Sequence, residues 1–532
     1  MVLSSKRMLL AGEAGIGKSC FSRGLQERWA SKDNRVYYEC IIYFTFTELK
    51  AIKSQVSVNE LLANKCKNLE PILPELLESG RVLIILDGYD EFIINNEENT
   101  LSKTVYNDTP LPVETLILNI LSKALLPNTD ILVTSRLSSR NVENTNVYFE
   151  RTFIMQEFTD DQIKQFYTKF CSDDISQTIY DFIEEHNLSS LVSIPLLSSA
   201  LFELSKNDGL RNSNLQRLTT QSEMMSSLLK VCLKNILSCE NDSNEQCCSV
   251  DMPSRNLPFN IKNMVEQLAE MSYINLLSEE EVIHVQDLGS CVHTQKLLDA
   301  FSEFFFKKTN ESAVLKYRHT SIRDMFAALH CAWNICKSQG IYECLNAWTW
   351  GIMPEQSSKT HSLLQNKNFK SNIMFDKFLN FFMGFFMYPD IDSLYNSEKS
   401  QQRVQYLKIY FEMWIKNQPN CSKLLNLFHC IYELQENELT ETLSREFTTV
   451  DLFNTPLNAL NIRAVEYTLE KSNLNKLDLT LCDFRNEHLN QLQIIIRNSV
   501  EVNLSSNMLN NKSGPILRRI LEHPNCAIKE LL

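Results

Sequence analysis

The stretch Gly12-Glu-Ala-Gly-Ile-Gly-Lys-Ser19 constrains the fold of this chain more than any other, because it fits the pattern GxxxxGK[ST]. It follows an apolar run, residues 7–11, and precedes a helix-forming segment, Ser19 to Ser31. Glycines let backbone N–H groups converge on phosphate oxygens, and the following helix directs its positive end there. In this pattern Lys18 reaches the β- and γ-phosphates, and Ser19 is a Mg²⁺ ligand. We therefore expect a strand, a loop and a helix that bind nucleotide phosphates through Gly12, Glu13, Ala14, Gly15, Ile16, Gly17, Lys18, Ser19 and Cys20.

A second apolar run, Val82 to Leu86, ends in acidic residues. Asp87 follows it directly and is expected to hold Mg²⁺, commonly through water. Asp90 or Glu91 is then placed to orient or deprotonate an attacking water molecule. A plain strand followed by an acidic turn is the alternative, and the phosphate loop upstream makes it the weaker one.

Two more runs complete the predicted sheet. Tyr37 to Phe46 is rich in β-branched and aromatic residues, and Asp130 to Thr134 ends in Ser135-Arg136. Arg136 is expected to sense the γ-phosphate, so that ATP and ADP make different contacts; a surface arginine closing a strand is the alternative. Arg140 is a weaker second candidate. Strands that alternate with amphipathic segments indicate a parallel sheet with crossover helices.

From about residue 153 to 455 the apolar spacing is helical, as in Ile163, Phe166 and Phe170. The most apolar run, Phe378 to Tyr388, is shorter than the roughly twenty residues that a membrane span needs. We expect it to fill a helical core, with a membrane or partner surface as the alternative.

The last residues change pattern again. The spacing Leu474-x-x-Leu-x-Leu-x-x-Cys482 fits the leucine-rich repeat template, and a second match ends at Asn507. A third begins at Ile528. So few repeats bury too little surface to be stable alone, so they must pack on the helical region or belong to a longer array.

Composition excludes several classes of protein. The formal net charge of −13 disfavours nucleic-acid binding, which requires a basic surface. The 16 cysteines lack the spacing of a zinc site, which favours reduced thiols in the cytosol. The N-terminal residues do not read as a secretory signal. We expect a cytoplasmic protein without a membrane span.

The glycine loop, the LDGYDEF segment and the Thr134-Ser-Arg136 segment together resemble the NACHT module of signal-transduction ATPases (the STAND class), and specifically NOD-like receptors. The resemblance continues through Met155-Gln-Glu-Phe158, Ile194-Pro195 and the signature from Tyr317 to Ala328. It implies an α/β P-loop NTPase with a parallel sheet, then mostly α-helical domains including a winged helix, and a short α/β leucine-rich repeat segment. The implied domains are a nucleotide-binding domain at 1–150, helical domain 1 at 151–212, a winged helix at 213–335, helical domain 2 at 336–455 and an incomplete repeat segment at 456–532.

The resemblance also implies two nucleotide contacts outside the first domain. Pro195 is expected to pack near the base. His319 is expected to contact the β-phosphate of ADP and to lock a closed, monomeric form. Without the surrounding signature, a histidine at a helix start is more simply explained by capping or core packing.

The chain departs from the family pattern at its start. No effector domain precedes residue 1, and the segment that usually completes the adenine pocket is absent, so we expect a fragment or a truncated gene product. The resemblance implies an ATP- and ADP-binding, Mg²⁺-dependent switch with weak ATPase activity, which oligomerises with itself or pairs with other NACHT proteins. An unidentified ligand is expected to bind the repeat or helical region. A continuously cycling ATPase that remodels a partner, and a regulator of a full-length relative that lacks an effector, are the alternatives.

Overall fold

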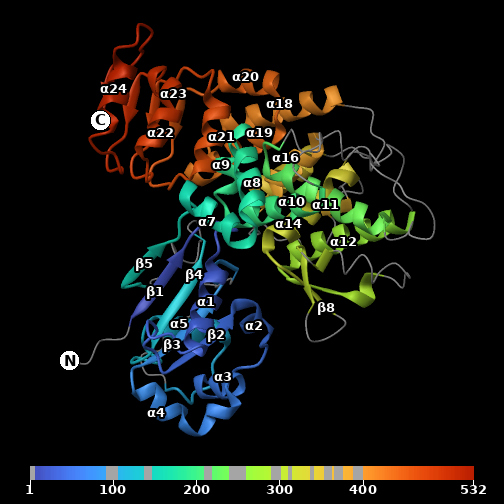
Figure 1. Ribbon diagram of the computed structural model, residues 1–532, viewed down its shortest axis with the longest axis vertical. Coiled ribbons are helices and arrows are strands. Elements are labelled where there is room, and N and C mark those ends of the chain that lie inside the picture. The colour runs from blue at the N-terminus through green and yellow to red at the C-terminus, as the bar shows by residue number, and fades with distance from the viewer. Residues whose placement is uncertain are drawn as a thin grey trace. The chain divides into compact units, whose positions relative to one another are not determined.

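The computed structural model describes residues 6–91, 106–136, 147–208, 218–238, 259–288, 301–302, 304–308, 314–335, 341–352, 362–364, 375–387 and 400–532. The chain forms two compact units, Met1–Gln156 and Glu157–Leu532. Each unit has its own secondary structure, coloured along the chain in Figure 1.

The first unit is built on a five-stranded parallel sheet with the strand order β2-β3-β4-β1-β5. The strands are β1 (Arg7–Ala11), β2 (Cys40–Thr45), β3 (Val82–Asp87), β4 (Asp130–Ser135) and β5 (Arg151–Ile154). The parallel sheet and its first four strands confirm the prediction from the apolar runs. The fifth was not predicted, because Arg151–Ile154 is exposed along its whole length and therefore has no apolar pattern.

Helices cover both faces of this sheet. On one face α1 (Lys18–Ala30) packs over Leu10, Ile85 and Leu132. The opposite face carries Leu9, Ile84 and Val133 in a larger core. Other helices of this unit contribute to that larger core: α2 (Phe46–Ala51), α3 (Val58–Lys65), the 3-10 helix η1 (Lys67–Ile72), α4 (Leu73–Glu78) and α5 (Val113–Leu121). Successive strand residues are buried on opposite faces, which is why these strands read as continuous apolar runs.

Arg7 ties the loop before β4 to β1. Its buried guanidinium donates to the backbone oxygens of Ile120 at 2.8 Å, Thr129 at 2.6 Å and Leu126 at 3.0 Å. Burial lowers the pKa of Arg7 to about 10, which still leaves it charged near neutral pH. The guanidinium therefore bonds to several carbonyl groups between α5 and β4 and holds this segment against β1.

The second unit is mainly helical. Its helices are α7 (Asp160–Phe170), α8 (Asp173–Glu185), α9 (Ser189–Val192), α10 (Pro195–Asp208), α11 (Gln221–Ser238), α12 (Phe259–Ser278), α14 (Thr320–Ile335), α15 (Ile341–Trp350), α16 (Asp376–Met387), α18 (Ser400–Lys416), α19 (Cys421–Leu434), α20 (Asn437–Ser444) and α21 (Ala459–Leu469). Helices α12, α14, α16, α19 and α21 pack in succession, each against the next.

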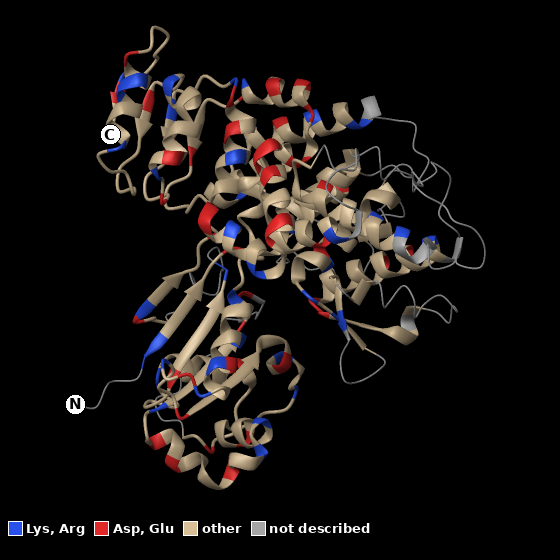
Figure 2. Cartoon of the chain, in the orientation of Figure 1, with Lys and Arg blue, Asp and Glu red and all other residues tan. Residues whose placement is uncertain are grey.

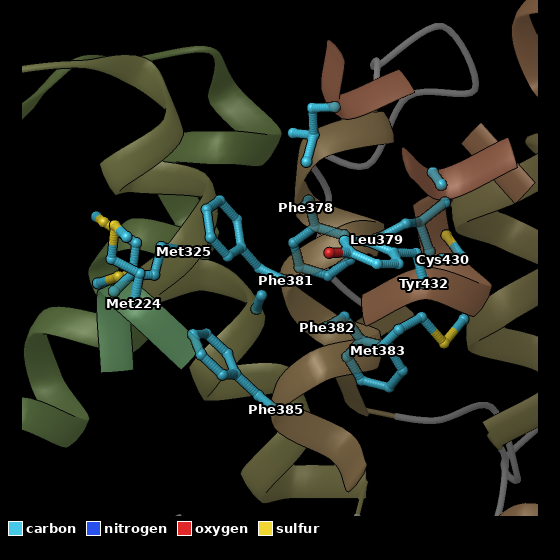
Figure 3. Close-up of a cluster of buried hydrophobic side chains, with 14 of the residues drawn as sticks. Met224, Met325, Phe378, Leu379, Phe381, Phe382, Met383, Phe385, Cys430 and Tyr432 are labelled. Atoms are coloured by element: carbon cyan, nitrogen blue, oxygen red, sulfur yellow. The ribbon is translucent and has the colours of Figure 1, made fainter. Parts of the chain in front are cut away.

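The apolar run of α16 contributes side chains to a buried hydrophobic cluster in this unit (Figure 3). Phe378, Phe382 and Met383 are fully buried, and Phe381 and Phe385 nearly so. This confirms the prediction that the run fills a helical core; Tyr388 lies outside the described residues. No helix in the described ranges is long and apolar enough to cross a membrane.

Short strands lie within the mainly helical region, where the apolar spacing alone did not indicate them. Strands β6 (Val282–His284), β7 (Phe306–Lys308) and β8 (Val314–Tyr317) form an antiparallel sheet in the order β6-β8-β7. The sheet lies along the chain between α12 and α14, in the segment for which the resemblance implies a winged helix. Strands of three or four residues are too short to show a period of two in the sequence.

The C-terminal end of the second unit is a parallel sheet, β9 (Thr449–Asp451), β10 (Lys476–Asp478), β11 (Glu501–Asn503) and β12 (Glu530–Leu531), in chain order. Helices α22 (Asn486–Gln491), α23 (Gln493–Arg497) and α24 (Ser513–Leu521) connect the strands (Figure 1). Leu477 pairs in register with Val502, and Val502 with Leu531. These are the template positions of the three predicted repeats; their assignment as leucine-rich repeats stays a prediction.

Asn507 ends the second match to the template, at the position that Cys482 occupies in the first. Its Oδ1 accepts from the backbone N–H groups of Cys482 at 2.9 Å and Phe484 at 3.0 Å. Its Nδ2 donates to the carbonyl oxygens of Leu479 at 2.6 Å and Leu504 at 2.9 Å. One side chain thus satisfies backbone groups of two successive strand–helix units.

Acidic and basic residues are interspersed over the helices of the second unit (Figure 2). The cysteines of the described segments are free thiols, and several of them, such as Cys331 and Cys430, are fully buried.

Candidate functional site

The loop between β1 and α1 has a backbone conformation that depends on glycine. Gly15 and Gly17 have φ values of 81° and 101°, in the left-handed region that side chains disfavour. Gly17 is also the N-cap of α1, and no side chain caps that end of the helix. The first N–H groups of a 13-residue helix therefore face the loop without a side-chain acceptor, an arrangement that suits a phosphate.

Gly12 is required for a different reason, the close approach of another backbone segment. A Cβ atom at this position would lie 3.0 Å from Ile16 Cγ2 and 3.1 Å from the carbonyl oxygen of Met155. Met155 follows β5, and its N–H donates to the carbonyl of Ala11 at 2.8 Å. Met155 is thus a loop-lining residue that the motif alone did not reveal.

Lys18 folds back over the loop that precedes it. Its Nζ donates to the carbonyl oxygens of Gly12 at 2.8 Å and Glu13 at 3.0 Å. Burial lowers the pKa of Lys18, and the negative charge of Asp90 opposes this effect. The ammonium is held at the mouth of the loop by neutral acceptors, which a phosphate oxygen would replace with a stronger, charged one.

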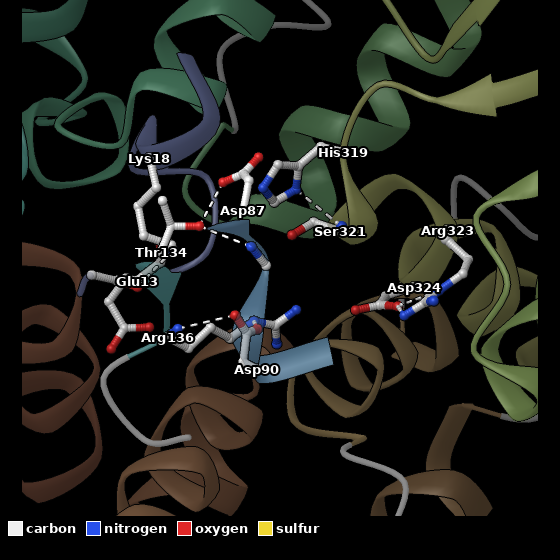
Figure 4. Close-up of polar contacts among 12 residues, drawn as sticks. Glu13, Lys18, Asp87, Asp90, Thr134, Arg136, His319, Ser321, Arg323 and Asp324 are labelled. Carbon is white, nitrogen blue, oxygen red and sulfur yellow. Dashed lines mark hydrogen bonds and ion pairs between the residues drawn. The ribbon is translucent and has the colours of Figure 1, made fainter. Parts of the chain in front are cut away.

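Asp87 is the last residue of β3 and is nearly buried (Figure 4). Its Oδ1 accepts from Thr134 Oγ1 at 2.5 Å, and its Oδ2 accepts from Tyr43 Oη at 2.6 Å. Thr134 belongs to β4 and Tyr43 to β2, the two strands beside β3. The sequence suggested Asp87 but not its hydroxyl partners, which come from strands distant in the chain.

Asp90 and Arg136 form an ion pair at the same end of the sheet (Figure 4). Arg136 Nε lies 2.8 Å from Asp90 Oδ2, and the Arg136 backbone N–H donates to Oδ1 at 3.1 Å. Both side chains are largely shielded from solvent. Glu91 ends the short helix η2 (Tyr89–Glu91), and its side chain lies outside the described structure, as does the whole of Arg140.

These residues fit a nucleotide and its metal ion. The loop and Lys18 supply donors for phosphate oxygens, while Ser19 and Asp87 supply the hydroxyl and carboxylate oxygens that Mg²⁺ accepts. Ser19 is in the first turn of α1, and Cys20, the next residue, is exposed. Strand β4 lies beside β1, and β3 lies beside β4, so their carboxyl ends bring Asp87, Asp90 and Arg136 to the same edge of the sheet as the loop.

Pro195 and His319 belong to the second unit. Pro195 begins α10, where a proline is favoured because its missing N–H leaves no donor unpaired. His319 precedes α14, and its Nδ1 accepts from the backbone N–H of Ser321 at 3.0 Å. His319 therefore has a helix-capping role, and its contact with a nucleotide, like that of Pro195, stays a prediction.

Comparison with known proteins identifies two segments. Residues 6–174 match the NACHT domain, and residues 319–442 match the NLRC4 helical domain HD2. The chain is 20% identical to NACHT, LRR and PYD domains-containing protein 5 of Mus musculus, over 98% of this chain and 46% of that protein. It is also 20% identical to NACHT, LRR and PYD domains-containing protein 3 of Bos taurus, over 98% of this chain and 54% of that protein. It is 20% identical to the NACHT, LRR and PYD domains-containing protein 1 homolog of Danio rerio, over 92% of this chain and 35% of that protein.

The chain thus spans about a third to a half of the length of these curated relatives. Among solved structures, a Walker-type ATPase of Pyrococcus abyssi covers 60% of this chain and 91% of its own, at 12% identity. Its TM-score is 0.28, too low a similarity to carry an argument.

Proposed function

The chain belongs to the NACHT-domain NOD-like receptor family, and we propose that it is an ATP- and ADP-dependent molecular switch. In this proposal it serves as an intracellular sensor or scaffold of the innate-immune type. Exchange of ADP for ATP permits self-association or pairing with other NACHT proteins, and slow Mg²⁺-dependent hydrolysis resets it. The strand–helix units after residue 456 are proposed to be leucine-rich repeats that, with the helical region, receive the ligand.

The observation that carries the proposal is the ion pair between Arg136 and Asp90 beside the phosphate loop. A γ-phosphate offers Arg136 a second anionic partner, whereas ADP does not extend to it. A switch requires contacts of this kind, which differ between the two nucleotides. An enzyme of rapid turnover would instead need Arg136 and Asp90 to be arranged for hydrolysis in every cycle.

The roles of the other residues follow from their chemistry. Lys18 and the loop N–H groups bind the phosphates, and Ser19 and Asp87 hold Mg²⁺, which neutralises phosphate charge. Asp90 or Glu91 orients water once Arg136 has moved to the γ-phosphate. Pro195 contacts the base and His319 the β-phosphate from the second unit, so the nucleotide state influences both units.

The energy required sets a limit on what the nucleotide does alone. Moving a two-state protein from mostly closed to mostly open takes about 5 kcal/mol of differential binding. A single charge-assisted contact contributes roughly 1.5–3 kcal/mol. Ligand binding to the C-terminal part is therefore proposed to supply the remainder, and the domain boundaries at 150, 212, 335 and 455 mark the parts that rearrange.

Nucleotide retention and turnover test this function. The chain purified from cells should carry tightly bound ADP, and Lys18→Ala should abolish retention, because the loop then lacks its only lysine. Lys53→Ala, an exposed position of the same unit, is the matched control and should retain ADP. Turnover above about one per second, at the low end of ordinary enzymes, would indicate a cycling ATPase instead.

A further inference from the structure

We propose that Tyr43 is a positioning residue that fixes the Asp87 carboxylate for Mg²⁺; this inference rests on the proposed nucleotide-binding function. Tyr43 lies in β2, in register with Ile85 of β3, and Thr45 pairs with Asp87. Residues two apart in a strand point to the same face. Tyr43 is therefore on the face of the sheet to which α1 packs, with its phenol directed along the strands toward Asp87.

The two hydroxyls that contact Asp87 are both constrained to donate. Thr134 Oγ1 accepts from the backbone N–H of Gly88 at 2.9 Å, which directs its own proton to Asp87 Oδ1. Tyr43 donates to Oδ2 at 2.6 Å and accepts from the Arg23 guanidinium. Each carboxylate oxygen is thus fixed by one donor from a neighbouring strand.

Neutral donors leave the carboxylate able to serve a cation. An ionised aspartate has about four lone-pair sites, and these two bonds use one on each oxygen. A second lone pair on each oxygen remains for Mg²⁺ or for a metal-bound water. Asp90 contrasts with this, since an arginine already neutralises its charge. Asp87 therefore keeps its charge for a cation, whereas the charge of Asp90 is already balanced by Arg136.

Arg23 extends the network to the helix that carries the other metal ligand. It lies four residues after Ser19 in α1, so both are on the same side of that helix. The chain of contacts Arg23–Tyr43–Asp87 therefore joins the helix bearing the Ser19 hydroxyl to the strand bearing the carboxylate. Partners that orient metal ligands typically change metal affinity by about 10- to 100-fold when removed.

The opposite end of the same sheet supplies a matched control. Tyr38 Oη donates to Asp130 Oδ2 at 2.9 Å, a tyrosine–aspartate contact at the amino end of the strands. Tyr38→Phe removes the same group from the same kind of bond, but far from the phosphate loop. A general effect on the sheet would appear in both variants.

The experiment measures binding of fluorescent ATP to the full chain, first in EDTA and then across a Mg²⁺ titration. Tyr43→Phe should raise by roughly tenfold the Mg²⁺ concentration at which Mg²⁺ has half of its full effect on ATP binding. It should leave the affinity for ATP in EDTA unchanged. Tyr38→Phe should behave like the wild type. Arg23→Gln, an exposed substitution, should shift the Mg²⁺ midpoint in the same direction, and it keeps the test valid if Tyr43→Phe does not fold.

Three outcomes would overturn the inference. An unchanged Mg²⁺ midpoint in Tyr43→Phe and Arg23→Gln would exclude the positioning role while nucleotide binding stands. An equal loss of affinity in EDTA would indicate a purely structural role. Failure of the wild type to bind ATP with or without Mg²⁺ would remove the proposed function itself, which distinguishes the two failures.

Discussion

The Arg136 guanidinium is paired with the Asp90 carboxylate, with Nε 2.8 Å from Oδ2, and the Arg136 backbone N–H engages the other oxygen. One residue therefore occupies both oxygens of the acid that is expected to orient water. In the proposed function, Asp90 orients water only after a γ-phosphate has replaced it as the anionic partner of Arg136. In the proposed switch, this pair would connect nucleotide recognition with slow turnover.

Arg136→Ala should reduce the preference for ATP over ADP. A hydrogen bond to a charged group is worth about 1.5–3 kcal/mol, so the ratio of the two affinities should fall roughly tenfold or more. Competition against a fluorescent nucleotide measures both affinities in one preparation. The ADP affinity serves as the internal reference, because damage to the fold would weaken both nucleotides.

Arg35→Ala is the matched control for this variant. Arg35 is paired with Asp33 at 2.7 Å in an exposed loop of the same unit. Its removal should leave both affinities unchanged, since exposed pairs contribute little. Equal ATP-to-ADP ratios in Arg136→Ala and wild type would show that Arg136 does not sense the γ-phosphate.

Gly384→Ala should destabilise the second unit. Gly384 lies in the middle of α16, and a Cβ there would be 2.3 Å from Ser222 Oγ and 2.4 Å from Ser222 Cβ. The Cβ atom of Ser222 is attached directly to the backbone of α11, so it cannot rotate away from the added methyl group. The two helices must therefore move apart, at a cost of about 1–3 kcal/mol. Urea unfolding of the wild type and the variant measures the difference.

Gly514→Ala provides the contrasting case in the same unit. Gly514 is in α24, and its added Cβ would meet nothing within 4 Å. Alanine favours helices over glycine by up to about 1 kcal/mol, so stability should be unchanged or higher. Similar effects of the two substitutions would contradict the close packing of α16 against α11.

Acidification should destabilise the second unit through His429 of α19. Its Nε2 lies 2.8 Å from Asn461 Oδ1, and its Nδ1 is buried without a hydrogen-bond partner. Burial, reinforced by Lys377, lowers the pKa of His429 from 6.5 to about 4. Between these values the unfolded chain binds the proton and the folded chain does not, so stability falls as the pH decreases from 6.5 to 4.

The contribution of His429 is isolated by comparison with His429→Gln, which cannot titrate. The stability advantage of the wild type over the variant should shrink by roughly 3 kcal/mol at most between pH 7.5 and pH 4. Glu433 acts in the opposite sense, because burial raises its pKa to about 7 and acidification through that value is stabilising. A pH-independent difference between wild type and His429→Gln would contradict the assignment.

The features predicted correctly from the sequence are those encoded locally. Strands β1, β2, β3 and β4 are buried on both faces, so each appears as an apolar run, and the glycine loop follows β1 directly. Two of its glycines, Gly15 and Gly17, provide the left-handed backbone conformations of the loop. The prediction of a buried helix at α16 rests on composition alone.

The features that the sequence did not predict depend on residues far apart in the chain. Tyr43 and Thr134 reach Asp87 from different strands, and Tyr43 looks like any half-buried strand residue. Glu433 accepts from the backbone N–H groups of Gln221 at 3.2 Å and Ser222 at 3.0 Å, and so caps α11 from a helix about two hundred residues later. No local pattern encodes such contacts.

The mass of the chain in solution tests the switch most directly. Light scattering on one preparation should give a monomer with ADP and a larger assembly with a non-hydrolysable ATP analogue and Mg²⁺. Lys18→Ala should show the same mass under both conditions. An identical wild-type mass with ADP and with the analogue, when both are bound, would contradict the claim that the nucleotide controls assembly.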